Sequence, residues 1–168
     1  MEQGMEQKHM TKQELLKLAK KEFATTLKVM HAFPEGKITF TPHERSQEAG
    51  RLMSTFIFEM YLCTSFVFGD ALDRDKFKNY KPESLNSLIA DFEKETTHIA
   101  ERLEKITDAE LSKTIEFGGA KFTTPEFILM MLCDQIHHRG QLTVYLRMAG
   151  GKIPSIYGPS ADDQTTNL

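Results

Sequence analysis

The sequence predicts an all-α protein, built as a four-helix bundle in one domain. Three observations favour this fold class. The chain has 168 residues, the size of one domain, and it contains only 10 glycines and 6 prolines, fewer than turn-rich all-β folds use. Four signals for the start of a helix each precede a long run with helical apolar spacing. Four long amphipathic helices in one domain bury their apolar faces as a bundle.

The first two helices are predicted from their starts. Thr11 and Glu14 have the spacing of a capping box, in which each side chain accepts from the backbone N–H of the other residue. Apolar residues follow at helical spacing as far as the Phe-Pro-Glu-Gly sequence at 33–36. Thr41, followed by a proline at the first helical position, marks the second start. We expect this second helix to run to Phe68.

The third and fourth helices are marked in a similar way. The third is expected to open at 81–84, Lys-Pro-Glu-Ser, and to reach about Thr107 with one apolar stripe. The fourth begins at Thr124, followed by proline and glutamate, and ends before the glycines at 150–151. Helices two and four are apolar on more than one face, which is typical of a helix that is central or covered by a partner chain. We therefore expect a homodimer.

The segments outside the four helices are expected to contain little regular secondary structure. The segment 69–81 is long and charged and holds at most a partial turn of helix. Two short runs around a Gly-Gly pair within 114–123 suit a tight hairpin. The tail, 152–168, contains prolines and a glycine that forbid a regular helix. We expect residues 1–10 to be frayed and residues 11–168 to form the single domain.

Charge and hydropathy argue against several classes of protein. The chain has 21 Lys and Arg against 24 Asp and Glu, a net charge of −3, which disfavours a nucleic-acid-binding surface. The longest run without a charge, Met60–Gly69, is too short to cross a bilayer, and the first residues lack the apolar core of a signal peptide. Two cysteines form neither a disulfide framework nor a four-thiolate metal site. We expect a cytoplasmic protein with no nucleic-acid and no membrane partner.

The expected fourth helix carries an unusual polar set. Asp134, His138 and Gln141 stack one turn apart within a stripe that is otherwise apolar. A carboxylate inside a bundle is costly unless it is paired, hydrogen-bonded or bound to a cation. Asp and His four residues apart on one helix can chelate a metal ion such as Zn²⁺, Mn²⁺ or Fe²⁺. The spacing by itself favours a metal-free polar network, in which Asp134 accepts from His138 and from a facing tyrosine or arginine.

Three stretches near the end of the chain carry a specific succession of residues. They are His137-His138-Arg139-Gly140-Gln141-Leu142, Tyr145-Leu146-Arg147 and Pro154-Ser155-Ile156-Tyr157-Gly158-Pro159-Ser160. In this succession the chain resembles the DinB-like (YfiT/DinB) superfamily, and the helix lengths and the long second crossover extend the resemblance over nearly the whole chain. The resemblance implies a bundle, often dimeric, with a divalent metal such as Zn²⁺ or Ni²⁺ held by three histidines between helices two and four. It also implies metal-dependent transferases or isomerases that use small thiols such as bacillithiol or mycothiol.

The sequence departs from the ligand pattern that the resemblance implies. His138 matches the second histidine of the family's pair, and Asp134 stands where the first is expected. The helix-two histidine is expected at 52–53, where the residues are Leu and Met. Glu48, one turn earlier, is a substitute ligand from a neighbouring turn, whereas Glu59 is about 10 Å further along the axis and is excluded unless the register differs. The metal site is therefore expected to be rebuilt from Asp134, His138 and Glu48, or lost.

Two functions follow from these observations. The first is a metal-dependent enzyme of the thiol-transferase or hydrolase type, in which a small molecule or thiol binds in a methionine-rich pocket. The second is a non-catalytic protein that has lost the metal and binds a small molecule or serves as a dimeric scaffold. We expect the pocket to be lined by Met53, Met131, Gln141 and Tyr145. Arg139 is expected to contact a facing carboxylate or a helix terminus rather than a substrate.

Overall fold

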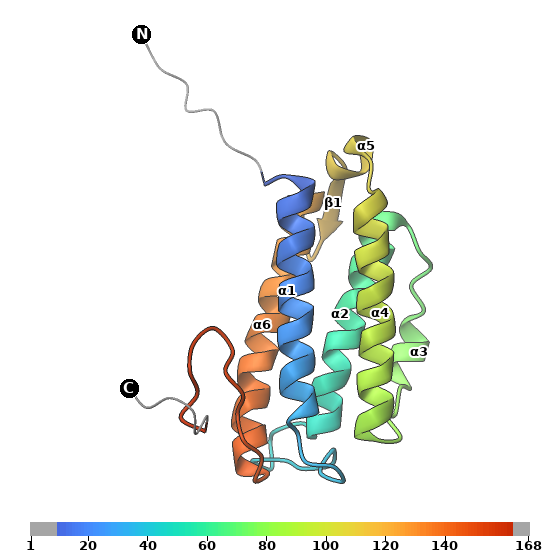
Figure 1. Ribbon diagram of the computed structural model, residues 1–168. Helices are drawn as coiled ribbons and strands as arrows, with labels where there is room; N and C mark the ends of the chain where they lie inside the picture. Colours follow the sequence, from blue (N-terminus) through green and yellow to red (C-terminus); the bar gives the residue numbers. More distant parts are fainter. Residues whose placement is uncertain (1–9, 163–168) are drawn as a thin grey trace.

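The computed structural model describes residues 10–162, and it is a bundle of four long helices with a small hairpin at one end (Figure 1). The long helices are α1 Lys12–His31, α2 Ala49–Phe68, α4 Leu85–Lys105 and α6 Thr124–Met148. The smaller elements are α3 Arg74–Lys78, α5 Asp108–Leu111, β1 Thr114–Phe117 and β2 Ala120–Thr123. The all-α bundle is confirmed. Of the segment expected to be frayed, 1–9 lies outside the described residues, as does 163–168 of the tail.

The helices form a four-sided bundle in which each long helix has two neighbours. Both α1 and α2 pack against α4 and α6, so α1 lies diagonally across from α2. In Figure 1, α1 and α6 run in one direction and α2 and α4 in the other. The parallel pair α2 and α4 therefore needs a connection as long as the bundle, and the segment that contains α3 supplies it. This arrangement makes α2 and α6 antiparallel neighbours, and the candidate site lies between them.

Local capping explains why most helix starts agree with the sequence. Thr11 and Glu14 form the predicted capping box of α1, and Thr123 forms the same motif with Glu126 before α6. The third helix starts later than expected, at Leu85, because the cap is Ser84 and the preceding Lys-Pro-Glu belongs to the crossover. Its last residue is Lys105, so it is also two residues shorter than expected at that end. The hairpin pairs Thr114 to Thr123 in the register that its Gly-Gly turn requires.

The start of the second helix differs from the prediction. Residues 42–46 form bends and turns, and α2 begins only at Ala49. The loop before it folds back on the helix: Ala49 and Gly50 donate their backbone N–H groups to the carbonyl oxygens of Phe40 and Ile38, at 2.9 and 2.6 Å. A Cβ at Gly50 would lie 3.1 Å from the Ile38 oxygen, so glycine permits this close approach. Tertiary packing here overrides the helix-start signal at Pro42.

The core is formed by apolar faces of all four long helices. Its central rings include Phe23, Phe56 and Phe92, with the ring centroids of Phe23 and Phe92 6.4 Å apart in edge-to-face contact. At the hairpin end, Phe117 and Phe122 pack on Phe127 of α6. The hairpin therefore closes one end of the core. It is stabilised by this aromatic contact, because an isolated two-stranded ribbon is marginal.

One ion pair is buried between α1 and α6. The Arg139 guanidinium, 1% exposed, donates to the Glu22 carboxylate at 2.7 Å and to the Thr26 hydroxyl at 3.2 Å. The Tyr157 hydroxyl from the tail donates to the same carboxylate at 2.6 Å and accepts from Arg139. The tail therefore fastens to the side of α1 and α6. Arg139 contacts a facing carboxylate, as expected from the sequence.

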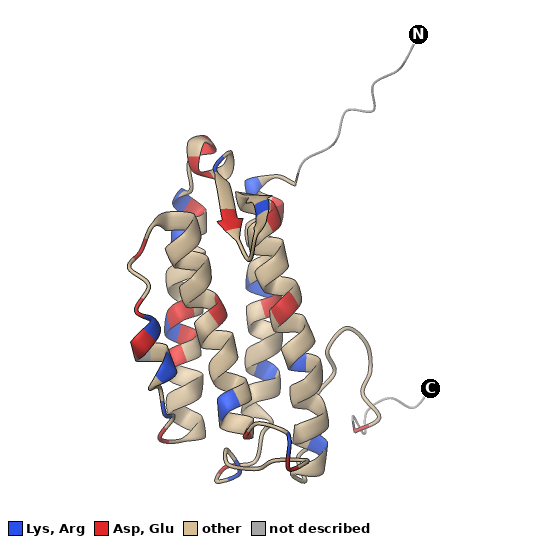
Figure 2. Ribbon diagram, turned by 180° about the vertical axis from the view of Figure 1, so that it is seen from behind, with Lys and Arg blue, Asp and Glu red and all other residues tan. Residues whose placement is uncertain are grey.

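Charged positions are distributed over the helices, with acidic and basic residues interspersed in the view of Figure 2. Within residues 10–162, none of the helices combines the length and the apolar character that a membrane span requires.

Candidate metal centre

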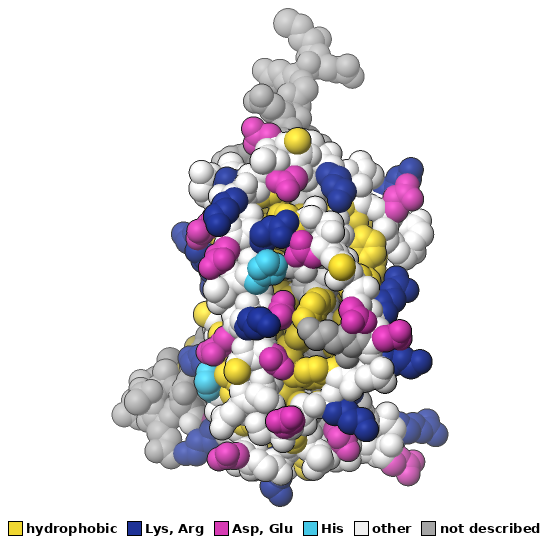
Figure 3. Space-filling view, turned by 90° about the vertical axis from the view of Figure 1, so that its right-hand side faces the viewer, with side chains coloured by type: hydrophobic (Ala, Val, Ile, Leu, Met, Phe, Trp, Pro, Cys, Tyr) yellow, Lys and Arg dark blue, Asp and Glu magenta, His cyan; other side chains and the backbone are white. Residues whose placement is uncertain are grey.

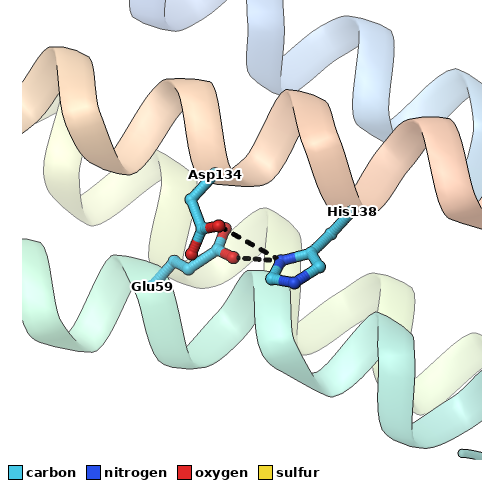
Figure 4. A group of neighbouring side chains, drawn as sticks. All are labelled: Glu59, Asp134 and His138. Atoms are coloured by element: carbon cyan, nitrogen blue, oxygen red, sulfur yellow. Dashed lines mark hydrogen bonds and ion pairs between the residues drawn. The ribbon is translucent and has the colours of Figure 1, made fainter.

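Two carboxylates and one imidazole meet between α2 and α6 (Figure 4). Glu59 projects from α2, and Asp134 and His138 project from the same side of α6, since residues four apart on a helix are neighbours. His138 Nδ1 lies 2.8 Å from Glu59 Oε1 and 4.0 Å from Asp134 Oδ1. One ligand atom from each residue lies within 4.8 Å of the other two. This spacing allows all three side chains to contact a single cation.

The three side chains span the depth of the interface from the core to the surface. The Glu59 side chain is 2% exposed, that of His138 21%, and that of Asp134 48%. Glu59 therefore lies at the buried end of the group and Asp134 at the solvent side. A small molecule or water can approach from the side of Asp134 and His138, whereas Glu59 is closed off by its own helix and by the core.

The Glu59 carboxyl group is the least satisfied polar group of the three. Its Oε1 is bonded to His138, but its Oε2 is buried and has no hydrogen-bond donor among the residues described. Burial, and next the negative charge of Asp134, raise the pKa of Glu59 from 4.5 to about 9. A proton on Glu59 allows the two carboxyl groups to hydrogen-bond to each other. A divalent cation would replace that proton and would attract both carboxylates.

The donor set is suited to a divalent metal of the first transition row. Carboxylate oxygens and imidazole nitrogen bind Zn²⁺, Mn²⁺ and Fe²⁺, and three protein ligands leave a position open for a small molecule. Cys63, one turn after Glu59 on α2, does not add a thiolate, because burial raises the pKa of its thiol to about 12. On its geometry and on the orphaned oxygen of Glu59, the group fits a metal ion.

Comparison with known proteins agrees with the fold and the sequence motifs. The profile of the DinB family matches residues 5–167. The chain belongs to the DinB family. The resemblance inferred from the motifs in α6 and the tail is thereby confirmed.

Two solved structures of DinB-like proteins share the fold. One, from Bacillus cereus ATCC 10987, has a TM-score of 0.77 and 23% sequence identity, covering 86% of this chain and 97% of that chain. The other, YjoA from Bacillus subtilis, has a TM-score of 0.70 and 20% identity, covering 87% of this chain and 98% of that chain. At these identities the likeness establishes the DinB fold alone.

A curated relative covers a shorter part of the chain. Uncharacterized protein YrdA from Bacillus subtilis (strain 168) is 39% identical over 57 residues, which are 34% of this chain and 34% of the relative. The matched stretch thus spans about a third of the relative's length. The name of this relative states no activity.

The structure brings together two of the three side chains expected as ligands for this DinB protein, and a different third carboxylate lies beside them. Asp134 and His138 lie side by side, but Glu48 is an exposed residue at the N-terminal end of α2 and is absent from the group. Glu59 lies beside them instead, because the register of α2 against α6 differs from the one for which Glu59 was excluded. Glu59 lies two turns, about 10 Å, further along α2 than the level expected at 52–53. The sequence does mark Glu59 as a candidate, because it is the only charged residue in the apolar run from 52 to 68.

The expected burial of Asp134 is also wrong. Its side chain is 48% exposed, and the buried carboxyl group is that of Glu59 on the facing helix. Apolar residues lie on nearly every side of α6, including the exposed Val144 and Met148, so the apolar stripe does not identify the inner face.

The residues expected to line a pocket lie in different surroundings. Met53 and Met131 are packed in the core, and Tyr145 is buried with its hydroxyl donating to the Gln47 carbonyl oxygen at 3.1 Å. Gln141 is exposed, and its side-chain nitrogen lies 2.9 Å from the His137 ring, so it does not line an internal pocket.

Proposed function

We propose that this DinB-family protein binds one divalent metal ion through Glu59, Asp134 and His138, and uses it in transfer or hydrolysis reactions of a small thiol or of water. The observation that carries the proposal is the buried Glu59 oxygen without a hydrogen-bond donor, held against a second carboxylate. Two facing carboxylates need a proton or a cation between them. The neighbouring imidazole supplies a third ligand for a cation.

Each of the three side chains has a distinct role in this proposal. When bound, a divalent cation lowers the pKa of a coordinated thiol or water, so that the nucleophile is present at neutral pH. Glu59 anchors the site from the core, since its side chain is fixed by burial and by the bond to His138. Asp134, half exposed, can shift toward or away from an incoming molecule. His138 bridges the two and must present a neutral Nδ1 to act as ligand.

Metal binding by the full chain tests this proposal. Protein treated with EDTA and then dialysed is titrated with Zn²⁺ and with Mn²⁺ in a calorimeter, and its metal content is measured after reconstitution. We expect one equivalent of metal, lost in Glu59→Gln and in His138→Ala. His31→Ala is the matched control, because His31 is an exposed histidine on α1 away from the site, and this variant retains the metal. No metal above background in the reconstituted wild type would contradict the proposal and would favour the metal-free binding or scaffold function.

The choice between thiol and water is tested with Co²⁺ in the same site. Adding a low-molecular-weight thiol such as 2-mercaptoethanol to the Co²⁺ protein is expected to produce a thiolate-to-metal charge-transfer band, because three protein ligands leave a position open. An unchanged spectrum over the full thiol titration would exclude thiol coordination and would leave water as the activated group.

The homodimer is part of the same proposal. Val144 and Met148, each 56% exposed, are large apolar side chains near the end of α6, and their exposure supports a partner on that helix. Light scattering coupled to size-exclusion chromatography is expected to give twice the 19.2 kDa chain mass. The Val144→Glu variant is expected to shift the mass to that of one chain.

A further inference from the structure

A chain of polar side chains runs through the core between α1 and α6. On the face that Figure 3 shows, charged side chains of both signs lie at the surface, around hydrophobic ones. In the core, Arg139 donates to the Thr26 hydroxyl at 3.2 Å, and that hydroxyl donates to Oε1 of Gln135, also at 3.2 Å. All three side chains are buried, and Gln135 is 0% exposed. This buried polar chain ends at the amide nitrogen of Gln135.

The orientation of the Gln135 amide follows from the groups around it. A guanidinium only donates hydrogen bonds, so Thr26 accepts from Arg139 and uses its own proton for Gln135. The oxygen of Gln135 is therefore the acceptor in this contact, and Nε2 remains as a donor. Arg139 is itself held by the Glu22 carboxylate at 2.7 Å. The amide nitrogen is thus fixed in the core, where no described residue accepts a hydrogen bond from it.

Two buried atoms lack a hydrogen-bond partner among the side chains described, and the two are complementary. One is the donor Nε2 of Gln135, and the other is Oε2 of Glu59, which accepts when the carboxyl group is ionised. Gln135 lies between Asp134 and His138 on α6, and both of these residues meet Glu59. Residues of a helix rise about 1.5 Å and turn about 100° each, so Gln135 lies at the level of Glu59, about 60° around α6 from His138.

A bridging water molecule would satisfy both atoms. Leaving either of them unpaired in the core is costly, and buried water molecules in proteins bond to such groups. A water molecule can accept from Nε2 of Gln135 and donate to Oε2 of Glu59. The Asp134 carboxylate, which has an oxygen within 4.8 Å of the Glu59 ligand atom, offers a further acceptor. We propose that one buried water molecule joins Gln135 to Glu59, and that Gln135 is thereby a positioning residue for this metal ligand.

The contact determines how Glu59 meets a metal ion, and for this effect it rests on the proposed metal function. The water molecule holds one carboxylate oxygen, so that the other faces the cation. Loss of a group that bonds to a ligand in this way typically lowers metal affinity about ten- to hundredfold. Arg139 supports the Gln135 amide through Thr26. The consecutive residues His138 and Arg139 therefore contribute to the metal centre in two ways, one as a ligand and the other as this support.

NMR of the metal-free protein tests the water contact. In EDTA, the side-chain amide protons of Gln135 are expected to give a cross-peak to the water resonance in a rotating-frame Overhauser experiment, with the sign of a dipolar contact. The cross-peak is expected to disappear in Glu59→Met, which removes the acceptor. Transfer through the Thr26 hydroxyl would leave it unchanged in that variant. Absence of the cross-peak in the wild type, or its retention in Glu59→Met, would overturn the proposal.

Metal affinity tests the positioning role. Gln135→Met keeps the length of the side chain and removes the donor, and its Zn²⁺ affinity is expected to fall at least tenfold. The absorption spectrum of its Co²⁺ complex is also expected to change, because the orientation of Glu59 determines the geometry around the ion. Leu142→Met is the matched control, since Leu142 is buried on the same side of α6, two turns after Gln135, and has no polar group. Its Zn²⁺ affinity and Co²⁺ spectrum are expected to equal those of the wild type.

The outcomes separate this proposal from the metal function. A folded Gln135→Met protein with wild-type Zn²⁺ affinity and an unchanged Co²⁺ spectrum would overturn the positioning role. If this variant does not fold, the double variant Thr26→Val/Gln135→Met, which also removes the hydroxyl left without an acceptor, is measured against the same expectation. A wild type that binds no metal would contradict the metal function and the positioning role with it. The water contact is measured in EDTA, so the cross-peak decides it in either case.

Discussion

Replacing Glu59 by glutamine tests the electrostatics of the candidate metal centre. Glu59 has a pKa of about 9 in the folded protein against an ordinary value of 4.5. Between these values the folded state keeps a proton that the unfolded state releases, so stability falls as pH rises from 4.5 to 9. At pH 7 the difference of 7 − 4.5 = 2.5 pH units corresponds to about 3 kcal/mol of lost stability in the metal-free protein. Glutamine has the shape of the protonated carboxyl group and does not titrate.

We therefore expect metal-free Glu59→Gln to be more stable than the metal-free wild type by about 3 kcal/mol at pH 7. The two proteins should have nearly equal stability at pH 4.5, and the gap should widen toward pH 9. Urea denaturation in EDTA at a series of pH values measures the gap directly. Saturating Zn²⁺ is expected to reverse the order, because a ligand that binds only the folded wild type stabilises it.

The control for this experiment is Glu93→Gln, which removes an exposed carboxylate of α4 and leaves the centre intact. Its stability is expected to follow the wild type at every pH. A gap between Glu59→Gln and wild type that is constant from pH 4.5 to 9 would refute the reasoning. So would a Glu59→Gln protein that is the less stable of the two at pH 8 without metal.

Three further predictions follow from the charges at the two polar clusters. Asp134→Asn removes the negative charge that helps to raise the pKa of Glu59. In the same urea series, the pH at which the stability of the metal-free protein levels off should therefore fall below 9. An unchanged pH profile would contradict this role of Asp134. Arg139→Met leaves the Glu22 carboxylate buried without its cation and is expected to cost about 3–5 kcal/mol in urea denaturation, a loss under 1 kcal/mol being inconsistent with the buried pair. Tyr157→Phe removes a hydrogen bond to the same carboxylate and is expected to cost about 1–2 kcal/mol; equal thermal stability of variant and wild type would show that the tail contact contributes nothing.

The parts of the fold that depend on local chemistry could be predicted from the sequence. The capping box at Thr11 and Glu14 and the Gly-Gly turn of the hairpin act within a few residues, so the starts of α1 and the hairpin follow from them. The start of α2 could not be found in this way. The signal at Pro42 is compatible with a helix and with turns, and the choice is made by the loop that bonds to Ala49 and Gly50.

Only the part of the candidate site that lies on a single helix could be predicted from the sequence. Asp134 and His138 lie on one helix, and their spacing of four residues is sufficient to place them together. Glu59 is 75 residues from Asp134 in the sequence, and its level depends on how far α2 slides along α6, which no local pattern contains. The sequence also does not show which side of α6 is buried, because apolar residues occur all around this helix. A single carboxylate within an apolar helix, such as Glu59, is the feature that indicates the missing ligand.

Anomalous X-ray diffraction from crystals grown with Zn²⁺ tests the central claim most directly. We predict one anomalous peak between α2 and α6, about 2.0–2.2 Å from oxygen atoms of Glu59 and Asp134 and from a ring nitrogen of His138. A peak bonded to other side chains, or no peak at that place in crystals of the wild type saturated with Zn²⁺, would contradict the account.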